Sequence, residues 1–279
     1  MVSSVESPLP AVARGIALHY AQHLVESAEV FADFQVRVDR PRGLQGWLGR
    51  QVAFEFDGRR PLAAMPGDQG FALLECGLDW CIASHCHQYL IVHAAALERG
   101  GRALLLPAPA GSGKSTLCAA LVRCGGWRLL SDELALIDPA SGHVVPLPRP
   151  VRLKGASIDA LQALVGAQGF VEVAHDNAQG RVACVRPPIE AVLRAHETAV
   201  PAWIVVPRYL DGADVQWQAQ SRARGFMALV NNAFNYNVHG RSGFDTLAQL
   251  VGLCECGELT YSDLAGAVAV CGQLVDFAL

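Results

Sequence analysis

Residues 107–116 of the chain, PAPAGSGKST, follow the apolar run RALLLPA and lead directly into KSTLCAALVRCG, which we expect to be a helix. This order of buried strand, glycine-containing loop and helix is the one that surrounds a phosphate chain in P-loop proteins. The P-loop pattern starts with a glycine, and Ala108 stands in that position here. Alanine is the smallest replacement, so the loop fails only if the position needs a positive φ. The stretch therefore predicts a nucleotide-binding loop within an α/β fold.

The loop supplies a complete set of groups for binding ATP and Mg²⁺. Its backbone N–H groups can surround an anion at the N-terminus of the following helix, where the helix dipole favours negative charge. We expect Lys114 to reach the β and γ phosphates and the Ser115 hydroxyl to coordinate the metal. The residues predicted to bind the nucleotide are Ala110, Gly111, Ser112, Gly113, Lys114, Ser115 and Thr116. The alternative is a chance match in a glycine-rich turn.

An acidic pair, Asp132 and Glu133, ends the run RLLSDE, one helix and a tight turn after the loop lysine. We expect both carboxylates at the end of the next strand, close to the metal and the γ phosphate. One acid, assigned as Asp132, would be the metal ligand, and Glu133 would take a proton from an attacking hydroxyl. The order of the two acids does not fix these roles, because a bend changes which face each side chain points to. The alternative is an exposed turn between two strands.

The segment RPVRLKG places three cations, Arg149, Arg152 and Lys154, close together after the acidic pair. One interpretation is a solvated loop before a helix that starts near Ser157. The other is a cationic wall that neutralises charge building on a transferred phosphoryl group, with Arg152 or Lys154 as its members. Arg181 is a weaker candidate for the same role.

The pattern of apolar residues divides the chain near residue 88. FQVRVD (34–39) and QVAFEF (51–56) alternate as half-buried strands do, so residues 1–88 are predicted to form a smaller β-containing region. From residue 89 onward, strands alternate with helices. GLDWCIASHCHQYL, at the end of the first region, is expected as a helix that leads into the second. In the second region the strands are expected in YLIVHAAAL, RALLLPA, WRLLSDELALID and PAWIVVP, and the helices, besides the one after the loop, in SRARGFMALVNNAF, GFDTLAQLVGLC and YSDLAGAVAVCGQLVDF, the last with Ser262 as its N-cap. Asn235, Tyr236 and His239 are expected in a loop between two helices, as a substrate lid or as ordinary loop packing.

Composition narrows the class of protein. The chain has 279 residues, 52% of them hydrophobic and 17% charged, with a formal net charge of −4, so it lacks the basic excess of a nucleic-acid binder. No signal peptide and no apolar run of membrane-spanning length is evident, which predicts a cytoplasmic protein that does not enter a membrane. The 9 cysteines lack the spacing of a zinc site and are expected to be reduced, buried thiols.

The combination of these motifs resembles a known family. IVHAAALERGGRALLLPAPAGSGKSTLCAALVRCGGWRLLSDE is similar to the catalytic core of HPr kinase/phosphorylase, in which a histidine, a P-loop and a pair of aspartates follow one another. LPRPVRLKGASI and FNYNVHGRSGF look most like the HprK-related kinase A family. The resemblance covers roughly residues 89 to 275 and implies a core of the HPr kinase/phosphoenolpyruvate carboxykinase type, with residues 89–279 as the catalytic domain.

The resemblance also implies an activity. It predicts an ATP-dependent kinase that phosphorylates a hydroxyl of a protein, peptide or small molecule, and a homo-oligomer, a hexamer or a smaller ring, as one arrangement. His93 matches the family's histidine and would bond the carboxylate pair or a phosphate oxygen. Glu133 departs from the family's second aspartate, so we predict kinase chemistry without phosphorylase chemistry. A nucleotide-dependent switch without phosphotransfer is the rival interpretation; a motor or transporter subunit fits less well because its further motifs are missing.

Overall fold

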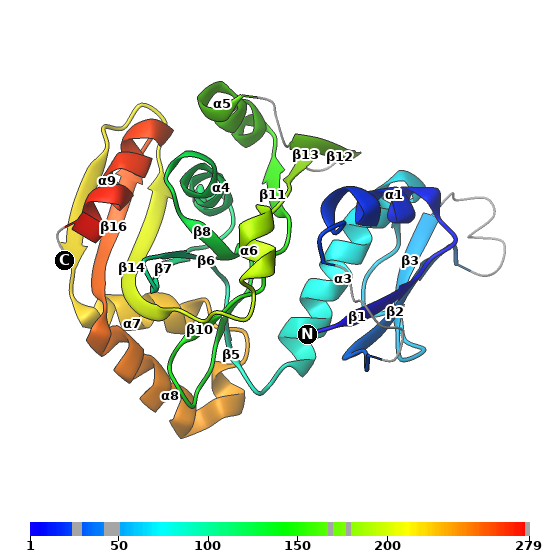
Figure 1. Cartoon of the computed structure of the whole chain (residues 1–279), viewed down its shortest axis with the longest axis horizontal. Coiled ribbons are helices and arrows are strands. Elements are labelled where there is room, and N and C mark those ends of the chain that lie inside the picture. The colour runs from blue at the N-terminus through cyan, green and yellow to red at the C-terminus, as the bar shows by residue number, and fades with distance from the viewer. Residues whose placement is uncertain (24–29, 42–50, 167–169, 177–179, 277–279) are drawn as a thin grey trace.

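The computed structural model describes residues 1–23, 30–41, 51–166, 170–176 and 180–276, and it has a mixed α/β architecture (Figure 1). A six-stranded sheet in the order β15-β16-β14-β7-β6-β8 forms the centre of the larger part. Strand β14 pairs in parallel with β7 and β16, whereas β6 runs antiparallel to both β7 and β8. These strands are β6 (Ala94–Arg99), β7 (Arg102–Pro107), β8 (Arg128–Ser131), β14 (Val200–Tyr209), β15 (Gln216–Gln220) and β16 (Glu255–Tyr261).

Helices cover both faces of this sheet, which explains why its central strands are continuous apolar runs. Leu104 and Leu106 of β7 pack in a core with helices α4, α5 and α9, while Ala103 and Leu105 pack on the opposite face with α7 and α8. The predicted strand RALLLPA and the helix after the loop are confirmed. The helices are α4 (Lys114–Cys124), α5 (Ala156–Val165), α7 (Arg222–Asn231), α8 (Tyr236–Leu253) and α9 (Leu264–Asp276).

The first region has its own sheet, in the order β1-β2-β3-β4, covered by α1 and α3 (Figure 1). The predicted strands at 34–39 and 51–56 are confirmed as β2 and β3. Helix α3 lies between this sheet and the larger part, and its core also includes Ile91 and Leu136 from beyond residue 88. The division at residue 88 therefore stays a prediction. The elements are β1 (Ser3–Glu6), α1 (Pro10–His19), β2 (Phe34–Asp39), β3 (Gln51–Phe56), β4 (Met65–Pro66), the short η1 (Gly67–Gln69) and α3 (Gly70–His85).

Two small antiparallel sheets complete the fold. One has the order β10-β9-β5 and the other the order β11-β13-β12. YLIVHAAAL, expected as a strand, is divided at His93 into β5 and β6, and WRLLSDELALID forms the pair β8 and β9 with the acids at the bend, as predicted. The remaining elements are β5 (Leu90–Val92), β9 (Ala135–Ile137), β10 (Val144–Val145), β11 (Val151–Lys154), β12 (Phe170–Asp176), β13 (Gly180–Val185) and α6 (Ile189–Leu193).

Three local predictions were wrong. RPVRLKG is no solvated loop, because its second half is strand β11. Tyr236 and His239 lie in the first turn of α8 rather than in a loop, and that helix kinks at Gly240. The N-cap of α9 is Asp263, whose carboxylate accepts hydrogen bonds from the Ala265 and Gly266 amides; the hydroxyl of Ser262 bonds elsewhere, to the Ala213 carbonyl.

Two further expectations concern cysteines and membranes. All nine cysteines are free thiols, and most are buried, in agreement with their predicted role as small apolar side chains. Within the described ranges, no cluster of three or more His, Cys, Asp or Glu side chains is placed to hold a metal ion. In the same ranges, none of the helices combines the length and the apolar character that crossing a bilayer requires.

Candidate functional site: the P-loop edge of the central sheet

The loop between β7 and α4 has the backbone conformation that its glycines permit. Gly111 and Gly113 have φ values of 85° and 89°, which other residues adopt only with strain. A side chain at Gly113 would also collide with the hydroxyl of Tyr261. Ala108 is fully buried and does not adopt a positive φ, so the missing first glycine costs the loop nothing in conformation.

Two neighbouring strands hold the loop in place. The amide of Tyr209, at the end of β14, donates to the Ser112 carbonyl at 2.9 Å. The hydroxyl of Tyr261, at the end of β16, donates to the Gly113 carbonyl at 3.1 Å. The first backbone bond of α4 runs from the Leu117 amide to that same carbonyl, at 2.9 Å. The amides of the first helical turn, which precede this bond, are therefore available to an anion.

The strand order brings the predicted site residues to one edge of the sheet. Ala94, at the start of β6, pairs with Pro107 at the end of β7, so His93 comes beside the loop. Ser131, at the end of β8, pairs with Ala96 near the start of β6. The bend that follows Ser131 carries the acidic pair to the same edge. Residues from three separate sequence motifs therefore meet where the P-loop begins.

Glu133 is the residue on which the polar contacts converge. Its Oε2 atom lies 2.9 Å from Nε2 of His93 and 3.2 Å from Nζ of Lys114. Lys114 is only 5% exposed, and its ammonium also donates to the Asp132 carbonyl at 3.3 Å. Burial acts to raise the pKa of Glu133, but the hydrogen bond from His93 and the charges of Lys114 and Arg152 lower it well below its usual range. Glu133 is therefore ionised in this arrangement.

Asp132 has the opposite environment. It is 5% exposed, and neither carboxylate oxygen has a hydrogen-bond partner of ordinary geometry. Burial and the neighbouring charge of Glu133 raise its pKa to about 6, although Lys114 and the nearby Ser115 hydroxyl favour the ionised form. A buried carboxylate without partners beside a hydroxyl fits Mg²⁺, which binds one or two carboxylates and otherwise uses water and phosphate oxygens.

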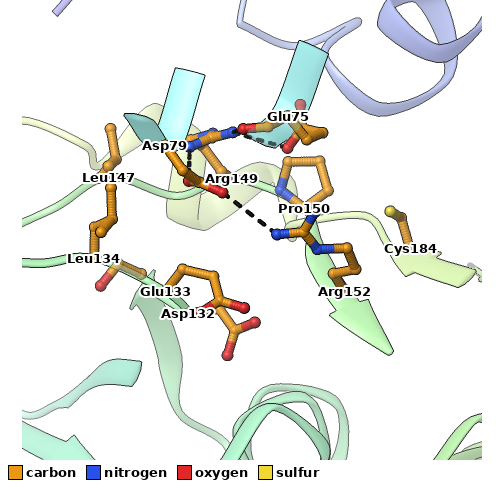
Figure 2. Close-up of a pocket in the computed structure, with 11 residues that line it drawn as sticks. Glu75, Asp79, Asp132, Glu133, Leu134, Leu147, Arg149, Pro150, Arg152 and Cys184 are labelled. Carbon is orange, nitrogen blue, oxygen red and sulfur yellow. Dashed lines mark hydrogen bonds and ion pairs between the residues drawn. The ribbon is translucent and has the colours of Figure 1, made fainter. Parts of the chain in front are cut away.

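A cavity of about 410 Å³ opens in front of the loop. Its walls include the P-loop, His93, Glu133, Arg152 and Lys154, together with Tyr209, Tyr261 and Leu264 on the side of β14 and α9. Asp132 lies outside this wall and lines a second, smaller pocket instead. Glu133 and Arg152 line both spaces, so the two adjoin at these side chains; Figure 2 shows the smaller space.

The three cations of RPVRLKG have different positions. Arg152 and Lys154 alternate along β11 with the buried Val151 and Leu153, so both face the cavity. Lys154 is exposed, whereas Arg152 is mostly buried and bonds Asp79 and Cys76 of α3. Arg149, from the same segment, does not line the cavity.

Arg149 turns instead toward α3, where it binds Glu75 and Asp79 (Figure 2). Arg181 also lies outside the cavity wall and pairs with Asp159 at 2.8 Å. Neither arginine is therefore placed to contact a ligand in front of the loop.

Asn235, from the segment FNYNVHG, bonds the backbone around β5. Asn235 is buried, accepts a hydrogen bond from the Ile91 amide at 2.9 Å and donates one to the Tyr89 carbonyl at 2.8 Å. These bonds fix β5, the strand that ends at His93. The ring of Phe234, half exposed, lies 5.9 Å from the His93 ring.

Sequence reasoning missed Asp79, Tyr209 and Tyr261. Each is distant in sequence from the loop or the acids, and none belongs to a motif. For Tyr209 and Tyr261, the available signal was their position at the ends of apolar stretches, which are strands β14 and β16.

No protein-family model matches the chain, and no curated protein matches it. The resemblance in its motifs therefore stays a prediction, and the assignment of the site depends on the geometry above.

Proposed function

We propose that the chain is an Mg²⁺-dependent, ATP-binding kinase of the HPr kinase-related type, which phosphorylates a hydroxyl of a protein, peptide or small molecule. The observation that carries the proposal is the contact of Lys114 and His93 with a single oxygen of Glu133 at the P-loop cavity. A P-loop core of the HPr kinase/phosphoenolpyruvate carboxykinase type is part of the proposal, supported by the histidine, loop and acidic pair at one edge of the sheet.

In the proposed phosphoryl transfer, each residue around the loop cavity has its own role. Lys114 and the loop amides would hold the β and γ phosphates, and Ser115 and Asp132 would hold Mg²⁺, which when bound would neutralise charge on the phosphate oxygens. In the transfer, Glu133 accepts the proton of the acceptor hydroxyl while the hydroxyl oxygen bonds to the γ phosphorus. The bond between the γ phosphorus and the bridging oxygen breaks, and ADP leaves with that oxygen. Arg152 and Lys154 face the oxygens on which negative charge increases.

Lys114 has two alternative partners in this scheme. Without nucleotide, its ammonium is neutralised by Glu133, 3.2 Å away. A triphosphate offers it several oxygens at higher negative charge, so binding ATP takes Lys114 from Glu133 and leaves that carboxylate to the acceptor. His93 remains to orient the carboxylate.

A nucleotide-dependent switch without phosphotransfer is the second candidate. It is favoured by the low basicity of Glu133, because the contacts with His93 and Lys114 lower the pKa of this carboxyl well below its usual range and so weaken it as a proton acceptor. The two functions differ in what Glu133→Gln does. The substitution abolishes transfer and spares ATP binding in a kinase, but changes little beyond hydrolysis in a switch.

The test is transfer of label from γ-labelled ATP with Mg²⁺ into protein and small-molecule fractions of the source cell's lysate. We expect the wild type to label an acceptor, and Lys114→Ala and Glu133→Gln to fall at least about 100-fold below it. Arg181→Ala, which removes a cation outside the cavity, should label as the wild type does. ATP binding that depends on Lys114, with no acceptor labelled in any fraction, would replace the kinase with the switch.

A further inference from the structure

Arg152 is held from outside its own sheet. Its Nη2 atom bonds Oδ2 of Asp79 at 3.4 Å, and its Nη1 atom donates to Sγ of Cys76 at 3.1 Å. Both partners lie on α3, three positions apart and so on one face of the helix. The guanidinium reaches the cavity wall from β11, but α3 sets its position (Figure 2).

Asp79 is itself fixed by a closed network. Arg149 bonds its other oxygen and also binds Glu75, through Oε2 at 3.0 Å and the backbone carbonyl at 3.1 Å. The Tyr20 hydroxyl of the first region accepts from Arg149 at 3.1 Å and donates to Glu75 at 2.7 Å. Asp79 therefore has little freedom to follow Arg152 if that side chain moves.

Without the contacts from α3, other carboxylates would compete with Asp79 for the charge of Arg152. Glu133 and Asp132 line the same small pocket as Arg152 and Asp79, and both are carboxylates. A free guanidinium forms its best bonds with a carboxylate in a bidentate pair. Pairing with Glu133 or Asp132 would remove the cation from the phosphoryl group and block an acid at the same time.

We infer that Asp79 is a positioning residue, which keeps Arg152 directed at the transferred phosphoryl group and away from the two active-site acids. This inference rests on the proposed function. It gives α3, and with it the first region of the chain, a role in positioning a residue of the proposed site. Asp79 itself lies outside the nucleotide cavity and touches no reacting atom in the scheme above.

Glu75 supplies a matched control for Asp79. Both are carboxylates on α3, and both bind Arg149, so removing either charge weakens the same network. Only Asp79 contacts Arg152. A loss of stability should therefore follow either substitution, whereas an effect on phosphoryl binding should follow Asp79→Asn alone.

The experiment measures the affinities of ADP and of ADP with aluminium fluoride, a mimic of the transferred phosphoryl group, by calorimetry in the presence of Mg²⁺. We expect the wild type to prefer the mimic, and Asp79→Asn and Arg152→Ala each to reduce this preference at least about tenfold, with ADP affinity unchanged. The double variant should lose no more than either single variant. Glu75→Gln should keep the preference within about twofold, although thermal unfolding shows it destabilised.

Three results separate the possible failures. Equal losses in Asp79→Asn and Glu75→Gln, or additive losses in the double variant, overturn the inference and leave the kinase proposal intact. Absence of nucleotide binding that depends on Lys114 refutes the proposed function and this inference with it. If Asp79→Asn does not fold, Asp79→Ser, which also removes the charge but is smaller, takes its place, and an unchanged preference for the mimic in that variant overturns the inference.

Discussion

The acidic pair and the network under α3 are two clusters of buried charge on either side of Arg152, and they are partnered very differently. Glu75 and Asp79 share Arg149, and the Tyr20 hydroxyl bonds both Arg149 and Glu75. At the P-loop edge, Asp132 has no hydrogen-bond partner of ordinary geometry, and Lys114 and His93 meet on one oxygen of Glu133. A partnered cluster stabilises the fold, whereas one with unpartnered oxygens costs stability until a ligand supplies the missing contacts. The difference supports the proposal that the P-loop edge binds a ligand and carries the chemistry.

The largest expected effect comes from breaking the partnered cluster. Arg149→Met has similar volume but removes the cation that pairs with the buried Glu75 and one of the two that pair with Asp79, so we expect the free energy of unfolding to fall by about 3–5 kcal/mol. Urea unfolding measures it. Arg181→Met, which removes the exposed pair with Asp159, should cost less than about 1 kcal/mol. Equal losses in the two variants would show that the network under α3 is no more stabilising than a surface ion pair.

The unpartnered cluster should respond in the opposite direction. Asp132→Asn removes a buried charge that lacks partners, and we expect the free energy of unfolding without ligand to rise by roughly 1 kcal/mol. The same change should lower the proposed Mg²⁺-dependent phosphoryl transfer on the order of 100-fold, because the carboxylate proposed to hold the metal is lost. Unfolding with and without Mg²⁺-ATP, together with the label-transfer assay, measures both. A variant that is less stable and fully active contradicts the comparison.

A third buried group, His19, should have a smaller effect on stability than Arg149, and this effect depends on pH. Neither ring nitrogen has a hydrogen-bond partner, and the ring stacks on Phe71 with centroids 5.2 Å apart. Burial, and then the charge of Arg186, lower the pKa of His19 to about 4. The unfolded chain therefore binds a proton that the folded chain excludes between about pH 6.5 and pH 4, and stability falls as the pH falls through that range.

Replacing His19 should remove this contribution. Between pH 7 and pH 5, we expect the wild type to lose about 2 kcal/mol more stability than His19→Phe, which keeps the stacked ring without a titrating group. Urea unfolding at the two pH values measures the difference. Parallel losses in the two proteins would mean that other groups carry the pH dependence.

The part of the site that could be predicted from the sequence is the part whose signals are local. The P-loop, its strand and its helix are contiguous, and the acidic pair follows within one element, so spacing alone brings them together. Asp79 could not be found in this way, because it meets Arg152 across 73 positions and lies in a helix with no motif. Strand β16 was missed for a similar reason, since its place in the sheet depends on parallel pairing with a strand far away along the chain.

The predictions of the N-cap of α9 and of the segment RPVRLKG were wrong for a different physical reason. Ser262 and Asp263 are adjacent and both favour an N-cap, and only the direction of the backbone decides between them. Arg149 and Arg152 have the same chemistry in the same short segment, yet one faces α3 alone and the other also faces the cavity. Residue type and spacing do not distinguish such neighbours; the three-dimensional packing of α3 against β11 does.

The bond between Tyr261 and the Gly113 carbonyl has a consequence for how the protein is made. It joins positions 148 residues apart, and it comes from the strand that inserts between β14 and β15. Contacts of such long sequence separation form late in folding, because the loop between them must first be closed. During synthesis, the glycine loop therefore leaves the ribosome long before the strand that supports it. The proposed ATP binding should thus appear only when β16 has emerged, and nucleotide affinity would then report completed folding.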